Sequence, residues 1–163
     1  MKLEEIFDSQ YTLKLADTAI KDMINPALRQ DGFTSTMIYQ VANDTTQIFM
    51  MGFKSGAWEV HHALAEPGKP FVSRNIINGS RSANPKFIST AMHLYQTRLD
   101  KGHTVRIVGN SAMWPTYKRV IDRMLKTNKY VASEVTVNSN SEHSQTLATK
   151  GKLESLTSML VPL

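Results

Sequence analysis

The sequence predicts an α/β (α+β) fold in which an antiparallel meander is followed by a helix, a strand, a second helix and a closing strand. Three observations lead to this prediction. The first half of the chain has β-branched and aromatic runs joined by turn residues, the second half has two segments with apolar residues every three or four positions, and a β-branched run separates these segments. With 163 residues, 41% of them hydrophobic, the chain can bury a proper core. We expect a single domain over residues 1–137.

The first 64 residues predict a short first element, a helix and three strands. Apolar residues at helical spacing between positions 3 and 28, with a break near Ser9, indicate a short first element such as a strand, and then a helix that ends before Pro26. Three β-branched and aromatic runs predict the antiparallel meander, namely residues 34–41, 47–53 and 58–64. Residues 71–77 are a candidate fourth strand.

Residues 84–137 have the clearest pattern. Asn84 and Pro85 are typical of a helix start, and Gly102 is typical of a helix end. The helix between them has an apolar stripe of Phe87, Ile88, Ala91, Met92, Tyr95 and Leu99. After a β-branched strand at 104–108, a second helix has an apolar face of Tyr117, Val120, Ile121, Met124 and Leu125. Residues 130–137 alternate as a closing strand.

The end of the chain has a different composition. Residues 138–152 are rich in Ser, Asn and Thr and lack apolar periodicity, so we expect a polar linker. Residues 153–163 form an apolar tail with six apolar side chains, namely Leu153, Leu156, Met159, Leu160, Val161 and Leu163. A helix this short is marginal alone in water. The tail is therefore expected to dock on its own domain, on another copy of the chain or on a partner protein.

Basic residues are concentrated in one part of the chain. The formal net charge is +5, but residues 74–130 contain eleven Lys and Arg against only Asp100 and Asp122. This excess predicts an anionic partner, which could be the phosphates of a cofactor, nucleic acid or an acidic protein surface. Solvated helix faces are the simpler interpretation for most of the eleven side chains.

The residue content argues against several classes of site. Without Cys, the chain has no thiol nucleophile and no thiolate metal site. His61 and His62 would point to opposite faces of a strand and cannot chelate one ion together, so we expect no metal site. The Gly-x-Ser-x-Gly motif of serine hydrolases and the phosphate loop of nucleotide hydrolases are missing. No apolar run has membrane-spanning length and residues 1–5 do not resemble a signal peptide, so we expect no membrane partner and no secretion through a signal peptide.

The loop before the helix at Pro85 is a candidate anion site. It contains a run of small residues and one arginine, namely Gly79, Ser80, Arg81, Ser82 and Ala83. Small residues let a ligand approach the backbone, and the free N–H groups and the dipole of a helix N-terminus favour a phosphate. Small polar residues also precede many helices without a ligand, so a structural role is the simpler interpretation when this loop is considered alone.

The order meander, loop, helix, strand, helix, strand resembles the Gcn5-related N-acetyltransferase (GNAT) superfamily, over residues 33–137. In that family a strand leads to an Asn, with an apolar residue three positions later and a Tyr seven positions later. Asn110, Met113 and Tyr117 have this spacing. Residues 109–123 also resemble small GNAT-like proteins of tailed bacteriophages, which likewise tend to begin with Met-Lys-Leu.

The resemblance implies a mixed sheet and roles for particular residues. The loop that contains residues 79–83 would bind the pyrophosphate of acetyl-CoA, and Asn110 would contact the cofactor or cap its helix. Tyr117 would protonate the departing thiolate as a general acid. Glu59 is the one carboxylate of the meander that we nominate as the base for the attacking amine.

Two features depart from the family pattern. The pyrophosphate signature requires a Gly at a fixed offset after Arg or Gln, and neither Arg74 nor Arg81 has it. Pro115 would interrupt a helix capped directly by Asn110, so the helix must begin late or kink. Tyr117 also fits the apolar stripe of its helix, so a buried core residue is an equally good interpretation.

Three functions therefore remain open. The first is a GNAT-like phage protein with a degenerate acyl-CoA site, a non-catalytic virion or accessory component that binds protein chains through residues 153–163 and an anionic ligand through its basic half. The second is an N-acetyltransferase that transfers the acetyl group of acetyl-CoA to an amine. The third is a basic nucleic-acid-binding protein. The expected location is the virion or the host cytoplasm.

Overall fold

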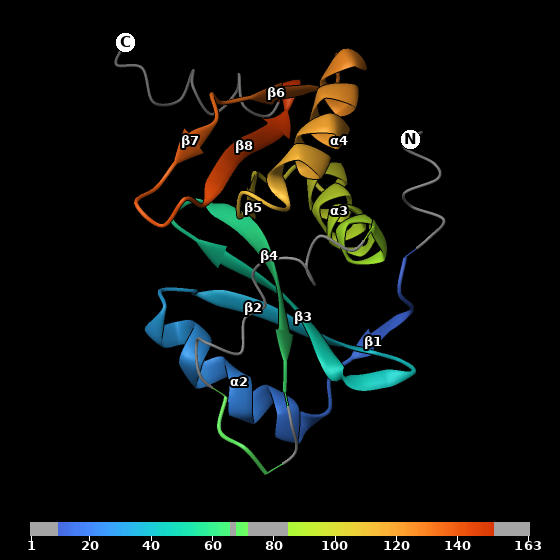
Figure 1. Cartoon of the computed structure of the whole chain (residues 1–163), viewed down its shortest axis with the longest axis vertical. Helices are drawn as coiled ribbons and strands as arrows, with labels where there is room; N and C mark the ends of the chain where they lie inside the picture. The colour runs from blue at the N-terminus through green and yellow to red at the C-terminus, as the bar shows by residue number, and fades with distance from the viewer. Residues whose placement is uncertain (1–9, 66–67, 72–84, 152–163) are drawn as a thin grey trace.

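The computed structural model describes residues 10–65, 68–71 and 85–151, which form one eight-stranded sheet and three helices (Figure 1). The sheet is mostly antiparallel, with strand order β1-β2-β3-β4-β5-β8-β6 and the short β7 paired to β8. The strands are β1 (Leu13–Leu15), β2 (Ser35–Val41), β3 (Asp44–Lys54), β4 (Ala57–Leu64), β5 (Val105–Gly109), β6 (Tyr130–Ala132), β7 (Thr136–Val137) and β8 (His143–Thr149). The helices are α2 (Thr18–Gln30), α3 (Pro85–Asp100) and α4 (Trp114–Lys126). The expected general α/β (α+β) class is confirmed.

Four predicted features lie outside the described residues. They are the short first element before Ser9, most of the candidate strand at 71–77, the candidate anion loop before Pro85 and the apolar tail at 153–163. In the part of the chain that is described, no helix combines the length and the apolar character needed to cross a membrane.

The predicted meander is present as β2, β3 and β4. The β3–β4 ladder is antiparallel and uninterrupted from Gln47 to Lys54, and β2 pairs antiparallel with the other edge of β3. Ser55 and Gly56 join β3 to β4 with positive φ angles of 51° and 84°. Glycine adopts such an angle without steric cost, which explains why the tight turn falls here.

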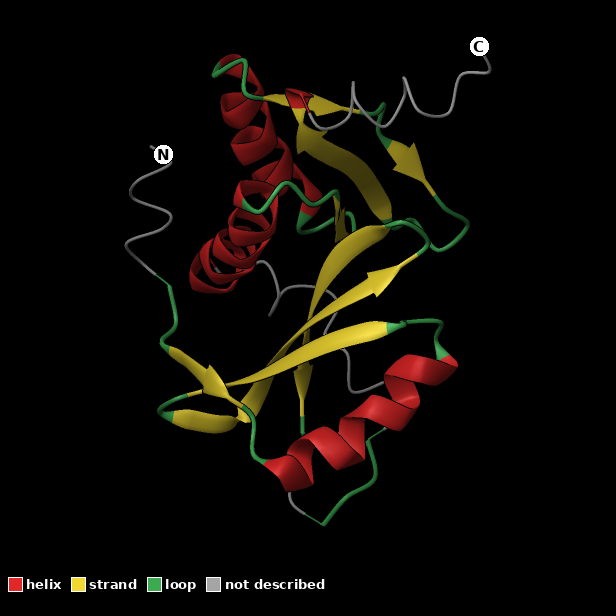
Figure 2. Cartoon of the chain, turned by 180° about the vertical axis from the view of Figure 1, so that it is seen from behind, coloured by secondary structure: helices red, strands yellow, loops and turns green. Residues whose placement is uncertain are grey.

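The helices cover opposite faces of the sheet. On one face, α2 packs over a core of Ile24, Leu28, Phe33, Ile38, Ile48 and Met50. On the other face, α3 and α4 lie beside each other (Figures 1 and 2), and their apolar stripes join Phe49, Met51, Val60, Val105 and Ile107. Successive side chains of a strand point to opposite faces. This alternation divides the apolar run of β3 between the two cores.

Helix α2 is longer than the sequence predicted. The expected end before Pro26 is wrong, because the helix continues through Pro26 to Gln30. A proline inside a helix removes one backbone hydrogen bond and costs about 3 kcal/mol. However, Ile24 and Leu28 on either side of it are only 0% and 2% exposed. Burial of two such side chains contributes roughly 3–6 kcal/mol, enough to keep the helix intact.

The predicted closing strand at 130–137 is divided into β6 and β7, and both pair with β8. Between these two strands, the Ser133 N–H donates to the Thr146 carbonyl at 2.9 Å. The Ser133 hydroxyl in turn accepts the Thr146 N–H at 3.0 Å. A side chain therefore replaces a backbone carbonyl at this point, and the regular ladder is interrupted.

The expected linker at 138–152 contains a strand. This expectation is wrong for His143–Thr149, because these residues form β8, inserted between β5 and β6. Leu147 and Ala148 of β8 are 0% and 2% exposed. The polar side chains that suggested a linker have partners in the sheet. The Gln145 amide, for example, donates to the Ser133 carbonyl at 2.8 Å.

Strands β4 and β5 are the parallel neighbours of the described sheet, and they pair at one position, Trp58 with Val105. Farther along β4, at Val60, the hydrogen-bond partner of the backbone is the side chain of Tyr95 of α3 and not β5. The Val60 N–H donates to the Tyr95 hydroxyl at 3.0 Å, and this hydroxyl lies 3.4 Å from the Val60 carbonyl, to which it donates. Burial raises the pKa of Tyr95, an effect that backbone hydrogen bonds of Val60 and Val108 partly offset. Tyr95 is therefore a neutral link between α3 and the diverging strands.

Removal of the Tyr95 hydroxyl should destabilise the fold. In Tyr95→Phe the buried Val60 N–H loses its partner, and we expect a loss of about 1–3 kcal/mol in the free energy of unfolding. Urea unfolding followed by tryptophan fluorescence measures this loss. The matched control is Tyr117→Phe, which removes a hydroxyl from the same core without affecting Val60. Equal midpoints for the wild type and Tyr95→Phe would contradict the assigned role of this hydrogen bond.

Candidate functional site

The space between β4 and β5 is the candidate site, because the first turn of α3 and the loop after β5 both border it. Side chains fill most of this space. Phe87, Tyr95 and Met113 are each at most 5% exposed. The remaining cavity has a volume of about 20 Å³ and is bordered by Val60, Phe87, Gly109 and Met113, among others. Such a volume holds about one water molecule. Among the described residues that border this cavity, there is no room for a cofactor unless the side chains move.

Tyr117, the candidate general acid, lies in the core. It is 1% exposed, and a Cβ added at Gly109 would lie 3.1 Å from its ring. The glycine at the end of β5 therefore makes room for this side chain. Burial, together with a smaller effect of Tyr95, raises the pKa of Tyr117 well above its usual value. A general acid works best when its pKa is near the operating pH. These features favour the interpretation of Tyr117 as a core residue.

Glu59, the candidate base, is part of an ion-pair cluster. Its carboxylate accepts hydrogen bonds from Arg106 at 2.8 Å and from His61 at 3.0 Å. Burial alone would raise the pKa of Glu59, but the hydrogen bonds and charges of His61 and Arg106 outweigh this effect and hold the pKa below its usual value. A carboxylate with a lowered pKa is a weaker base.

Arg106 connects this cluster to the backbone of the meander. Its guanidinium also donates to the carbonyls of Lys54 and Ser55, at 3.2 and 3.0 Å. The cluster therefore ties β5 to β4 and to the β3–β4 turn. Sequence analysis did not identify this role of Arg106. Its only signal was a single charged residue inside a β-branched run.

The structure does not bring Glu59 and Tyr117 together. Side chains alternate along β4, so that Glu59 and His61 lie on the face covered by α2, where Phe33 contacts His61 with ring centroids 5.9 Å apart. Tyr117 belongs to the core on the opposite face, with Val60. An acid and a base for one acyl transfer should converge on the same reacting atoms.

Asn110 holds the turn at residues 111–113, which comes directly before helix α4. Its side-chain oxygen accepts the N–H groups of Ala112 and Met113, at 3.1 and 3.0 Å. The helix begins at Trp114, so Pro115 lies in the first turn, where no intrahelical N–H bond is lost. Of the two expected alternatives, a late start and a kink, the structure has the late start. Met113 occupies the N-cap position of α4, and the Asn110 side chain acts one turn earlier.

The remaining candidate residues form no further site in the described part of the chain. Gly79, Ser80, Arg81, Ser82 and Ala83 all lie outside the described residues. His61 and His62 lie on opposite faces, as predicted, since His62 packs against Phe87 with ring centroids 4.8 Å apart. Within residues 10–65, 68–71 and 85–151, no group of three or more His, Asp and Glu side chains could hold a metal ion.

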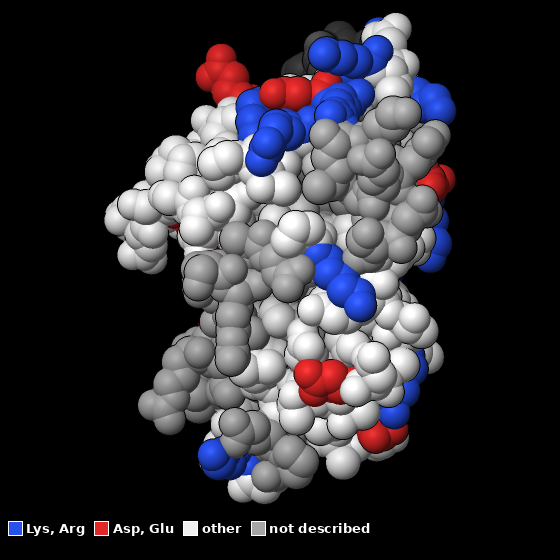
Figure 3. All heavy atoms as spheres, turned by 45° about the vertical axis from the view of Figure 1, so that its right-hand side comes forward, with Lys and Arg blue, Asp and Glu red and all other residues white. Residues whose placement is uncertain are grey.

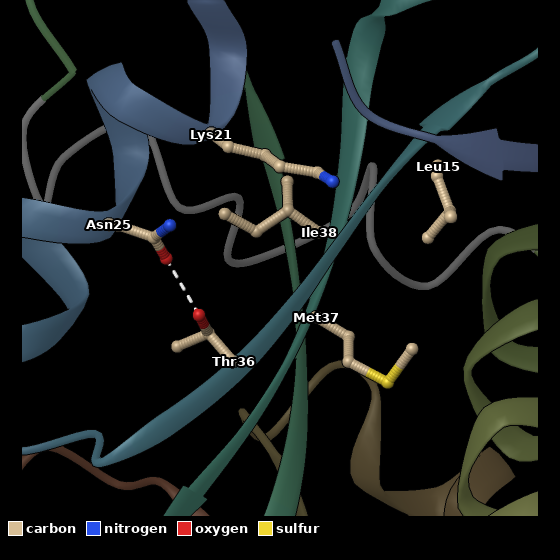
Figure 4. Close-up of a pocket in the computed structure, with 6 residues that line it drawn as sticks. All are labelled: Leu15, Lys21, Asn25, Thr36, Met37 and Ile38. Carbon is tan, nitrogen blue, oxygen red and sulfur yellow. Dashed lines mark hydrogen bonds between the residues drawn. The ribbon is translucent and has the colours of Figure 1, made fainter. Parts of the chain in front are cut away.

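A second pocket, of about 150 Å³, opens beside the edge of β2 (Figure 4). It exists because β1 pairs only with residues 39–41 of β2. Figure 4 shows Lys21 and Asn25 of α2 reaching toward this strand, with Asn25 accepting a hydrogen bond from the Thr36 hydroxyl at 2.6 Å. Leu15 at the rim is 59% exposed. Its described lining residues include no carboxylate or imidazole.

In comparisons with protein-family models, curated proteins and solved structures, this chain had no match.

The Glu59–Arg106 pair should make stability depend on pH. Because the folded-state pKa of Glu59 lies below the usual value of 4.5, its contribution is fully present above pH 4.5 and is lost as the pH falls through the folded-state pKa. We expect Glu59→Gln to cost about 1.5–3 kcal/mol at neutral pH. The difference in the free energy of unfolding between this variant and the wild type should shrink as the pH falls below 4.5.

Urea midpoints of both proteins at several pH values measure this effect. The control is Asp122→Asn, which removes the exposed Lys118–Asp122 pair of α4 and should change stability little at any pH. A cost of Glu59→Gln that stays constant down to the acid limit of the fold would contradict the assigned ionisation of Glu59.

Proposed function

We propose that the protein is a GNAT-like domain with a degenerate acyl-CoA site, which serves as a non-catalytic virion or accessory component of a tailed bacteriophage. The observation that carries this proposal is the filled space between β4 and β5, where the cavity bordered by Phe87 and Met113 has a volume of only about 20 Å³. A protein with this role would act in the virion or in the host cytoplasm.

Two features support the GNAT-like part of the proposal. The described chain has the order meander, helix, strand, helix on which the resemblance rests, with β4 and β5 as parallel neighbours. Asn110, which has the family spacing to Met113 and Tyr117, accepts two backbone N–H groups of the turn between β5 and α4. The phage part rests on the resemblance of residues 109–123.

The positions of the candidate catalytic groups support the non-catalytic part. Tyr117 is buried on one face of the sheet, and Glu59 is neutralised by Arg106 on the other. In addition, neither Arg74 nor Arg81 is followed by the Gly of the pyrophosphate signature. Each group that catalysis would require thus has a structural role or departs from the family pattern.

The alternative function is an acyl-CoA-dependent N-acetyltransferase, which the spacing of Asn110, Met113 and Tyr117 favours. In this reaction the amine nitrogen would form a bond to the acetyl carbonyl carbon and lose a proton to Glu59 or water. The carbon–sulfur bond would then break, and Tyr117 would protonate the thiolate. Because Tyr117 is only 1% exposed, the core around it would have to open for this hydroxyl to reach a substrate.

Calorimetric titration of acetyl-CoA into the protein distinguishes the two functions. We expect no heat of binding, and no rise in the melting temperature at millimolar acetyl-CoA, because the site is filled. Micromolar binding that Arg81→Ala weakens would instead make the N-acetyltransferase the leading function. Tyr117→Phe would then be expected to spare binding and impair turnover.

We further propose that residues 153–163 bind other protein chains, in the first instance copies of this chain. Sedimentation velocity should detect oligomers of the full chain, and Leu156→Ser with Leu160→Ser should abolish them because apolar burial drives such contacts. The matched control, Ser155→Ala with Ser158→Ala, changes polar positions of the same segment and should leave the oligomers intact. A monomeric wild-type chain would contradict this role of the tail.

A further inference from the structure

The outer face of α4 has a row of unpaired positive charges. Arg119, Arg123 and Lys126 lie within one narrow arc of the helix, given 3.6 residues per turn. This arc is opposite the buried stripe that contains Tyr117 and Met124. Figure 3 shows Lys and Arg side chains gathered over the end of the molecule where α4 lies. We call Arg119, Arg123 and Lys126 the basic row.

Asp122, the one carboxylate of α4, offsets only part of this charge, although it lies three residues after Arg119 and four before Lys126. Asp122 pairs with Lys118 at 2.9 Å, on the side of the helix next to the row. Among the described residues, the three side chains of the basic row form no ion pair with a carboxylate. Three mutually repelling cations on one helix face are costly unless an anion compensates them. The row therefore fits a ligand with several negative charges along its length.

A groove continues from the end of this helix. Its volume is about 340 Å³, within the range of ligand pockets, and its lining includes Lys129, Tyr130, Gly102 and Leu99. Lys129 follows α4 by three residues, so the chain itself connects the basic row to the groove. Lys101 and Lys150 are exposed at positions adjoining the lining residues. The described lining also includes one carboxylate, Asp100, so the groove combines an aromatic side chain with a net excess of surrounding cations.

Tyr130 is held in a defined orientation in this groove. Gln96 of α3 donates a hydrogen bond to its hydroxyl, and the same amide nitrogen donates to Asp100 at 2.9 Å. The ring also packs against the core below it. A fixed aromatic ring beside positive charges is the combination on which proteins stack the bases of single-stranded nucleic acid. A duplex would use the charges but would leave the ring without a function.

We propose that α4 and the adjacent groove bind single-stranded nucleic acid, with the phosphates along Arg119, Arg123, Lys126 and Lys129 and a base against Tyr130. This surface is separate from the space between β4 and β5, so the proposal does not depend on whether the protein binds acyl-CoA.

Fluorescence anisotropy with a labelled single-stranded 20-mer tests the proposal. Four phosphate contacts predict a fall in affinity of about fiftyfold between about 50 and about 200 mM salt. Arg119→Gln, Arg123→Gln and Lys126→Gln together should reduce the slope of log affinity against log salt by about two. The matched control removes the same charge at Lys14, Lys21 and Arg29, on β1 and α2, and should leave this slope unchanged.

The contribution of Tyr130 is tested separately. Tyr130→Leu should weaken binding at least about fivefold, because stacking on the ring is lost, whereas Tyr130→Phe should retain wild-type affinity. Circular dichroism confirms that both variants are folded. Three results would overturn the proposal: no binding of the 20-mer at low salt, equal affinity for a duplex of the same length, or equal affinity for polyglutamate.

Discussion

The hydrogen bonds between the Tyr95 hydroxyl and the backbone of Val60 determine how the two halves of the sheet are joined. Parallel strands β4 and β5 share one paired position and then diverge. Beyond that point the edge of β4 would have unpaired backbone groups in a dry environment, which is costly. The Tyr95 hydroxyl meets this need from α3. The contact with Val60 fixes α3 at the point where the strands diverge. Phe87 of α3 and Met113, the residue before α4, then fill most of the space between β4 and β5.

This constraint gives structural roles to residues whose types also suit catalysis. Asn110 satisfies the N–H groups at the start of α4, and Tyr117 fills the volume that Gly109 leaves open. On the other face of the sheet, the ion pair between Glu59 and Arg106 links β4 to β5. The proposed function follows from this arrangement, since a space used for packing is not free for a cofactor chain. The outer face of α4 is subject to no such constraint, and there the charges are directed to the solvent.

Local patterns in the sequence were sufficient to predict the meander, α3, β5 and α4, because apolar spacing directly reflects burial on one face. They failed for β8, whose polar side chains are satisfied by partners distant in sequence, such as Ser133 for Gln145. They also failed at Pro26, where tertiary burial outweighs a local helix breaker. At the candidate site, the opposite orientations of His61 and His62 and the late start of α4 were predictable. The apolar stripe predicted that Tyr95 is buried, but spacing contains no information on what a hydroxyl binds.

The central claim is that Tyr95 and the core side chains close the space between β4 and β5. Amide hydrogen exchange of Val60, followed by NMR, tests it most directly, because this N–H donates to the Tyr95 hydroxyl. The account predicts that Val60 exchanges only through global unfolding, as slowly as the central amides of β3, and that acetyl-CoA does not change its rate. Rapid exchange of Val60 in an otherwise protected β4 would show that the space opens in the native protein, and would contradict the account.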